Sequence, residues 1–364
     1  MPQKLPKIRT DPRTELVIRR ADVEPVDARN PATFYRYKDL PRLRGFGGKL
    51  IIHDDVTVPL TFQARWPIEI DSLESLSNCT LRFNTLRADS IAMPKAELYC
   101  RRVVARELLV HWLTADHCDV PNMTVRKCLF IRKSLLCDRK LLFGPTVQLD
   151  QGHPIDLKGT ARIRTLQAIA SQVHFEDLEI VENADIRAAH DPARRITTVI
   201  KGKLLRGAGT VTLHGRDADI ETIELVGKLY FGNMSLTAIV MDVDGGILGG
   251  ELHVLRDCTT DGELYVSQDI HAHNLLVADK LTAGGSIICS GVIDCGGVIR
   301  VGIESNATVD WAINPRIECH RITRGRVFVP QVTERALLET AAPPTVATQR
   351  VLRLPTAQEK PPVE

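Results

Sequence analysis

The apolar residues between Gly262 and Gly302 recur at steps of five and six residues, and three successive steps sum to 17. An α-helix needs apolar steps of three and four, and a half-buried strand alternates by two. Apolar columns that repeat at a longer fixed interval are typical of a chain that coils and stacks on itself. We therefore predict stacked coils with inward columns of Leu264, Leu281 and Val298; of Ile270 and Ile287; and of Leu275 and Val292.

The same interval returns independently between Leu73 and Leu142. An apolar spacing of five also runs from Leu98 to Cys128, but basic residues and a histidine stand where a pentapeptide repeat needs small ones. The 17-residue interval is therefore the better description. Its inward columns here are predicted to be Leu86, Val103, Val120 and Cys137, and Ile91, Leu108, Val125 and Leu142.

The predicted fold class is all-β, a single-stranded β-solenoid (a parallel β-helix) with about 17 residues per coil. Glycine pairs such as Gly245–Gly246 and Gly284–Gly285 are expected at corners, where a positive φ turns the chain. Residues 188–195 are predicted to form a loop inserted into one coil. We predict four segments, namely a basic, proline-containing arm and cap over residues 1–45, the solenoid over 46–330, a short capping helix over 331–342 and a proline-rich tail over 343–364.

Composition narrows the function classes. The net charge of +2, from 47 basic and 45 acidic residues, indicates neither a nucleic-acid nor a membrane partner. Nine cysteines without a CxxC pair are predicted to be buried thiols in a reducing compartment. The first residues have no apolar signal region, and no run is long enough to span a membrane. We expect a cytoplasmic protein, or part of an assembly built in the cytoplasm.

Charge is distributed unevenly along the chain. Residues 95–140 hold ten basic and five acidic side chains, whereas residues 240–310 hold three basic and eleven acidic ones. Opposite charges at different heights of a solenoid favour head-to-tail or staggered association. The candidate docking residues are the basic side chains of the first block together with two leucines near the C-terminus, namely Arg101, Arg102, Arg126, Lys127, Arg132, Lys133, Leu352 and Leu354.

Two groups of residues raise the question of chemistry in the C-terminal coils. His271 and His273 share one face of a strand, and His253 lies about one coil earlier, so the three imidazoles are candidate zinc ligands. Several aspartates, among them Asp242 and Asp244, are candidate groups for glycoside cleavage. We favour the interpretation that both groups are solvated outer side chains. No catalytic residue, metal ligand or cofactor is therefore predicted.

One stretch, LTAGGSIICSGVIDCGGVIRVG, resembles the bactofilins, bacterial cytoskeletal proteins that form polymers. The resemblance rests on short β-branched triplets that alternate with glycine and on flanking proline-containing tails, and it is good over about residues 243–302. It implies a right-handed triangular β-helix that joins end to end without nucleotide. This chain is long for that family, its middle is irregular, and both of its ends are predicted to be covered.

The expected function is that of a non-enzymatic structural or assembly protein that self-associates or docks through charged faces and tails. Its predicted partners are copies of itself or other protein subunits, with no specific nucleic acid and no membrane span. The alternative is a β-helix that binds or cleaves a polysaccharide along its acidic C-terminal coils. Tyr265 and Trp311 are the aromatic residues available there for sugar stacking.

Overall fold

In the computed structural model the chain divides into two compact units, Met1–Arg216 and Asp217–Glu364. The residues described are 15–27, 34–144, 154–188, 199–302, 317–329 and 350–352. The predicted capping helix over 331–342 lies outside these residues. So does most of the predicted tail, apart from the short strand at Arg350–Leu352.

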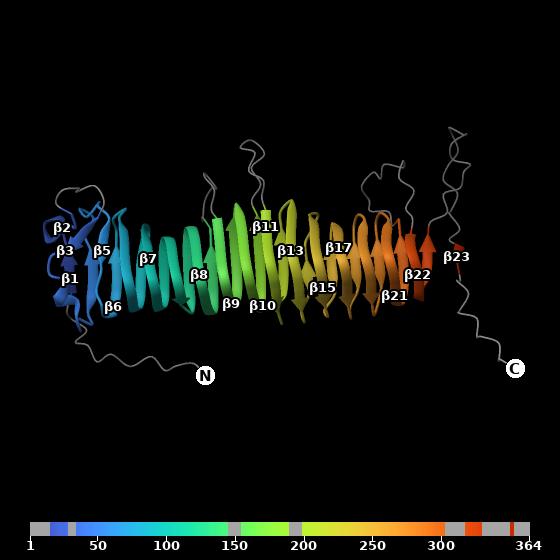
Figure 1. The fold of residues 1–364 in the computed structure, drawn as a ribbon, viewed down its shortest axis with the longest axis horizontal. Coiled ribbons are helices and arrows are strands. Elements are labelled where there is room, and N and C mark those ends of the chain that lie inside the picture. Colours follow the sequence, from blue (N-terminus) through green and yellow to red (C-terminus); the bar gives the residue numbers. More distant parts are fainter. Residues whose placement is uncertain are drawn as a thin grey trace, which may run out of the picture. The chain divides into compact units, whose positions relative to one another are not determined.

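Unit one is built from parallel strands that stack coil upon coil (Figure 1). Its one described antiparallel pair joins β2 to β3. Two 3₁₀ turns, η1 (Arg20–Asp22) and η2 (Leu40–Leu43), complete the described elements. The strands are β1 (Glu15–Ile18), β2 (Val23–Pro25), β3 (Tyr35–Tyr37), β4 (Lys49–Ile52), β5 (Leu60–Phe62), β6 (Ile68–Ser75), β7 (Thr80–Asp119), β8 (Asn122–Phe143), β9 (Pro154–Ala170), β10 (Gln172–Ala188), β11 (Val199–Gly207) and β12 (Thr210–His214).

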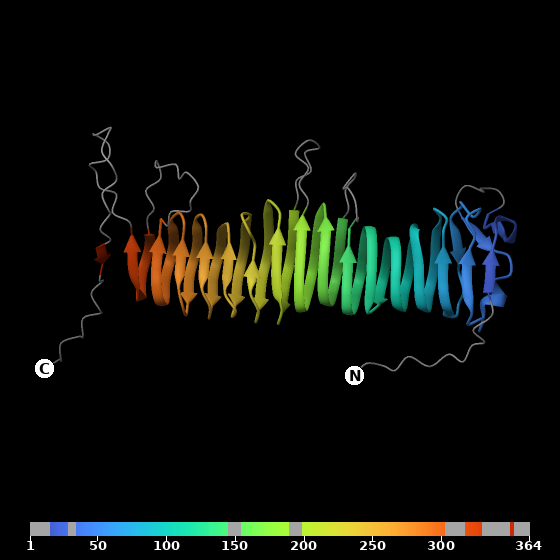
Figure 2. The same cartoon turned by 180° about the vertical axis from the view of Figure 1, so that it is seen from behind.

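Unit two repeats the parallel stacking with shorter strands, which Figure 2 shows from behind. Its described antiparallel pair is β22 with β23. The strands are β13 (Asp217–Leu225), β14 (Leu229–Tyr230), β15 (Ser235–Val243), β16 (Ile247–Gly249), β17 (Glu251–Thr260), β18 (Leu264–Val266), β19 (Ile270–Val277), β20 (Leu281–Ala283), β21 (Ile287–Val301), β22 (Ile317–Val329) and β23 (Arg350–Leu352). The predicted all-β parallel solenoid is confirmed.

The core of unit two consists of rows of identical or similar apolar side chains. Leu264 of β18 lies in register with Leu281 of β20, and Ile270 of β19 lies in register with Ile287 of β21, as the sequence interval predicts. All four side chains are fully buried. Each row places like side chains in contact on neighbouring coils, so the repeating sequence builds a continuous apolar interior.

Two predicted inward positions are wrong. Leu281 pairs with Ile299 rather than Val298, and Leu275 pairs with Ile293 rather than Val292. Both isoleucines are fully buried, whereas both valines are half-buried. The coil here contains one extra residue at an irregularity after Ala272, and a shift of one residue exchanges the inward and outward sides of a strand.

Variable coil length also corrects one predicted column of unit one. Leu108 pairs with Met123 rather than Val125, because this coil is shorter than the predicted interval, and Val125 pairs with Val110 instead. Leu108 and Val125 are both buried all the same. Leu142 is only half-buried, while its neighbours Leu141 and Phe143 point into the core.

Longer steps in the register mark insertions. Val173 pairs with Ile155 on the preceding coil and with Ile200 on the following one. Many more residues separate Val173 from Ile200 than separate Ile155 from Val173. The predicted loop over residues 188–195 falls in this longer interval, and its residues after Ala188 lie outside the described part. A second long interval, from Ile131 to its partner Leu157, was not predicted from the sequence; it includes residues 145–153, which also lie outside the described part.

The stacking in unit one begins before residue 46. Leu16 of β1 pairs with Leu50 of β4, and Tyr35 of β3 pairs with Leu60 of β5, both in parallel. Within the predicted cap, Tyr37 and Leu43 are buried. The N-terminal segment thus supplies strands to the first coils, and its part as a cover stays a prediction.

The two glycine pairs named above are required for two different reasons, of which the sequence analysis predicted one. Of the two pairs named above, only Gly246 has a positive φ, of 104°. At Gly284 a Cβ atom would overlap the backbone oxygen of Ser267 on the preceding coil. Glycine is needed there because the backbones of two coils approach closely, and any side chain would push them apart.

Removing apolar volume from an inward row should destabilise the fold. We expect Leu281→Ala to lower the free energy of unfolding by about 2–5 kcal/mol, because a fully buried leucine leaves a cavity. Leu276→Ala is the matched control, since Leu276 is 43% exposed, and it should cost less than about 1 kcal/mol. Urea unfolding of the two variants measures the difference. Equal losses would contradict the inward assignment of Leu281.

The cysteines provide a second test of the core. All nine are free; eight are buried, and Cys319 is half-buried. Burial raises the pKa of the Cys128 and Cys137 thiols to about 11 and that of Cys258 to about 12.

Burial also raises the pKa of Cys319, but this thiol is the least buried of the nine, so iodoacetamide at about pH 8 should modify it fastest in the native protein. Unfolding in denaturant should make all nine thiols reactive. Mass spectrometry of the alkylated peptides reads out both states. Rapid native labelling of Cys258 would contradict the core described above.

Candidate functional site

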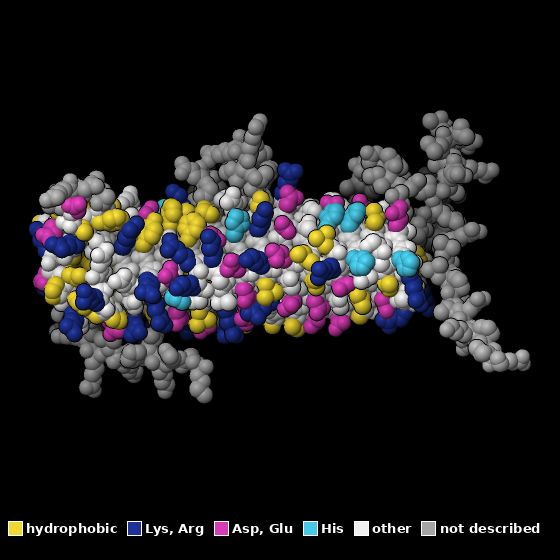
Figure 3. Space-filling model, in the orientation of Figure 1, with side chains coloured by type: hydrophobic (Ala, Val, Ile, Leu, Met, Phe, Trp, Pro, Cys, Tyr) yellow, Lys and Arg dark blue, Asp and Glu magenta, His cyan; other side chains and the backbone are white. Residues whose placement is uncertain are grey.

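Unit one carries an aromatic surface that we call the aromatic face, made by Tyr99, Trp112 and Phe130 on successive coils. The register places Thr114 beside Phe130 and Leu113 beside Leu129, so Trp112, Thr114 and Phe130 point to the same outer side. The Trp112 and Phe130 ring centroids lie 5.7 Å apart at an interplanar angle of 37°. Figure 3 shows hydrophobic side chains gathered over β7 and β8.

Arginine extends the aromatic face toward the N-terminal coils. The Arg82 guanidinium carbon lies 4.1 Å from the Phe34 ring centroid and 5.2 Å from that of Tyr99. Burial, and then the charge of Glu97, raises the pKa of the Tyr99 phenol. This phenol therefore stays neutral and donates a hydrogen bond of 3.4 Å to Glu97. The result is a row of flat groups bordered by charge.

Two pockets lie along this face. One, of about 430 Å³, is bounded by Arg82, Asn84 and Tyr99 together with residues of the next coils. The other, of about 290 Å³, is lined by Trp112 and Phe130 with several charged residues at its edge. Tyr99, Thr114 and Arg132 belong to both pockets, so the two are adjacent. The arrangement can hold an extended, flat and polar ligand.

Sequence analysis missed the aromatic face. Its three rings stand far apart along the chain, and none of them follows another directly. Only the stacking of coils brings them beside Arg132. The sequence did contain a signal. Each ring stands one residue before or after an inward leucine, and neighbouring residues of a strand point to opposite sides, so the rings must point outward.

The predicted basic docking residues of unit one point outward, but not on one surface. All are exposed except Lys127, which is half-buried. Arg132 and Lys133 occupy the corner between two paired segments, Ala115 with Ile131 and His117 with Ser134.

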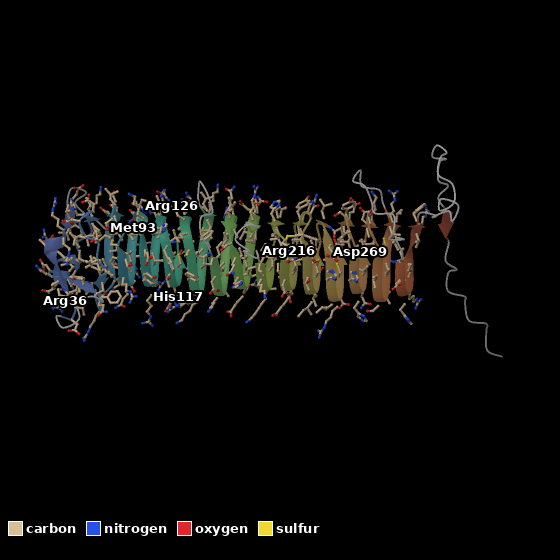
Figure 4. The ribbon with its side chains drawn as sticks, turned by 90° about the horizontal axis from the view of Figure 1, so that it is seen from above. Arg36, Met93, His117, Arg126, Arg216 and Asp269 are labelled. Carbon is tan, nitrogen blue, oxygen red and sulfur yellow. The ribbon has the colours of Figure 1, made fainter. Side chains whose placement is uncertain are left out.

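Arg126 and Lys127 occupy a different corner, between the pairs Val110 with Val125 and Trp112 with Cys128. Figure 4 shows Arg126 and His117 at opposite edges of the ribbon. The chain therefore has two basic corners, one at Arg132–Lys133 and one at Arg126–Lys127.

Ion pairing differs sharply between parts of unit one. Basic residues of β9 to β11 pair with acids on neighbouring coils, as in Arg162 with Glu179 and Arg206 with Asp177. Among the described residues, Arg101, Arg102, Arg126, Lys127 and Lys133 form no such ion pair, and Arg132 reaches Asp116 only at 3.9 Å. Among the described residues, the positive charge of the basic corners is thus compensated less than that of β9 to β11.

The two predicted leucines of the docking set fall differently. Leu352 is the last residue of β23, whose backbone pairs with that of β22 at Val327. Leu354 lies outside the described residues. Their part in docking stays a prediction.

The row of Asp242 contains one pair of acids in register, Glu224 of β13 beside Asp242 of β15, and is then interrupted. Thr259 and Leu276 follow Asp242 on the next two coils, before Asp294 is reached. Asp294 is itself paired with Arg324. Beyond Asp242 the carboxylates of this row are separated, so Glu224 with Asp242 is the adjacent acid pair that the row offers to the carbohydrate alternative. Tyr265 is half-buried, and Trp311 lies outside the described residues.

The three predicted histidines are divided by the structure. His253 and His271 lie in register on β17 and β19, with their ring centroids 4.6 Å apart. His273 is separate and shares a 2.8 Å hydrogen bond with Ser290. Glu251, which the sequence analysis did not single out, joins the pair through a 3.0 Å contact to His253. Its position two residues before His253 was the available signal, since both side chains leave the strand on one side.

Comparisons with known proteins assign no family. No family model matches the chain, and no curated protein or solved structure matches it. No helix among the described residues has the length and apolar content needed to cross a membrane. The fold and the surfaces described above are therefore the basis for a functional assignment.

Proposed function

We propose that this protein is a non-enzymatic structural or assembly component, a β-helical scaffold that self-associates or docks with other protein subunits. The observation that carries the proposal is the positive charge of the basic corners, where Arg132 with Asp116 is the one ion pair among the described residues. Exposed cations that lack internal partners are available to acidic protein surfaces, and they steer association over distances of about a Debye length.

A complementary surface exists on the same chain. Asp242, Asp244 and Asp261 are exposed in unit two, where acidic residues outnumber basic ones. A second copy can therefore present acids to the basic corners of the first. Exposed ion pairs contribute little individually, so the charges orient the contact and apolar groups must add to its affinity. The resemblance to polymer-forming bactofilins over residues 243–302 agrees with this role.

Charge reversal tests the proposal. We expect the wild-type protein to associate at about 50 mM salt and to dissociate at about 500 mM, where the Debye length falls to about 4 Å. Arg132→Glu with Lys133→Glu, and Arg126→Glu with Lys127→Glu, each change the charge of one basic corner. Loss of low-salt association in either double variant, measured by sedimentation velocity, would identify the corner that docks.

Arg162→Glu with Arg164→Glu is the matched control, because it makes the same change of net charge at residues that are already ion-paired. Circular dichroism establishes that each variant is folded. A wild-type protein that sediments as the same monomer at both salt concentrations would contradict self-association.

A second candidate function is binding of an acidic polysaccharide, favoured by the aromatic face. Ring faces stack on sugars, and cations beside the rings, such as Arg132 and Lys158, suit carboxylate or sulfate groups on the polymer. This surface lies in unit one, whereas the sequence analysis placed the carbohydrate alternative on the acidic coils of unit two.

A panel of acidic polysaccharides in affinity electrophoresis tests this candidate. Trp112→Ala should weaken the affinity for the retarding polymer at least about tenfold, as loss of a central aromatic contact does. Tyr265→Ala, in unit two, should leave it unchanged. Retardation by single-stranded nucleic acid alone would reject the polysaccharide. Turnover of the polymer that is lost in Asp242→Ala or Asp244→Ala would instead support the enzymatic alternative.

A further inference from the structure

Glu251, His253 and His271 form a compact group on the outer side of unit two, which we call the histidine clip. One ligand atom from each side chain lies within 4.8 Å of the other two. Among the described residues, this is the one place where three potential metal-ligand side chains come this close together. Figure 3 shows histidines gathered on this part of the surface.

The backbone holds these three side chains in place. Leu252 pairs with Ile270 and Val254 with Ala272, and all four are buried, so the residues between them must point outward. The backbone pairing therefore holds His253 and His271 side by side on adjacent coils. A site arranged in advance loses little conformational freedom when an ion binds.

The donor set has a clear chemical preference. Two imidazole nitrogens and one carboxylate oxygen suit Zn²⁺, Co²⁺ or Ni²⁺, whereas Ca²⁺ and Mg²⁺ require oxygen ligands. The side chains of Glu251 and His253 are 32% and 34% exposed, so an ion from solution can reach them.

The spacing is close to that of a coordinated ion. Glu251 Oε1 and His253 Nε2 are 3.0 Å apart, and ligand atoms around tetrahedral zinc are separated by about 3.3 Å when its bonds are about 2.0–2.1 Å long. The two imidazole planes are nearly parallel, at 16°. Because an ion lies in the plane of each ring that binds it, the rings must tilt toward one another, which the soft χ2 torsion of histidine permits.

We propose that the histidine clip binds one divalent transition-metal ion, with Zn²⁺ as the physiological choice. The ion joins β17 to β19 and so links two successive coils through their side chains. Three protein ligands leave a fourth position for water or for a ligand from another molecule. The proposal is independent of the assembly role, because it concerns the binding of an ion to a single chain.

Calorimetric titration with Zn²⁺, on metal-free protein without an affinity tag, tests the proposal. Loss of an outer-shell partner alone costs about 10–100-fold in metal affinity, so Glu251→Gln, His253→Ala and His271→Ala should each weaken binding at least about tenfold. His273→Ala is the matched control, since His273 lies on the same strand but outside the clip, and it should bind as the wild type does.

Two further measurements separate a true site from loose surface binding. Co²⁺ should give the visible absorption of a four- or five-coordinate site in the wild type and in His273→Ala, but not in His271→Ala. Zn²⁺ should also raise the melting temperature of the wild type and of His273→Ala only, because a ligand that binds the folded state stabilises it. No binding by the wild type, or equal loss in His273→Ala, would overturn the proposal.

Discussion

Parallel backbone pairing between successive coils is the constraint on which everything else in this structure depends. It fixes which residue of one coil lies beside which residue of the next, as in Leu264 beside Leu281. A slip of one residue would turn an apolar row toward solvent. The apolar rows therefore select the register, and the register in turn sets the position of every outward side chain.

This arrangement brings chemistry together from distant parts of the chain. His253 and His271 belong to different coils, yet they stack ring on ring in space. Trp112 and Phe130 come together in the same way. In such a solenoid, any specificity for a ligand or partner lies in short rows of outer residues.

Charge follows the same rule with opposite results in two parts of unit one. In β9 to β11 neighbouring coils carry opposite charges, so Arg162 and Glu179 compensate one another. At the basic corners the register places basic side chains next to one another. Among the described residues, only Arg132 there has an acid within ion-pairing distance, and that contact is long. The first region is neutralised within the chain, whereas the second remains available to a partner. That contrast, more than the total charge of the protein, supports a role in assembly.

The sequence by itself determined the fold class, the core rows such as Ile270 with Ile287, and the outward direction of the basic residues, because the periodicity of apolar residues encodes which side of a strand faces inward. It could not place Val292 and Val298 correctly. One extra residue in a coil changes the register, but the apolar residues of the sequence still recur at steps of five and six. It also divided the candidate sites wrongly, including His273 with the two stacked histidines and overlooking Glu251. Only the tertiary structure decided which outer residues meet, because the number of residues in each coil varies and contact across coils depends on that number.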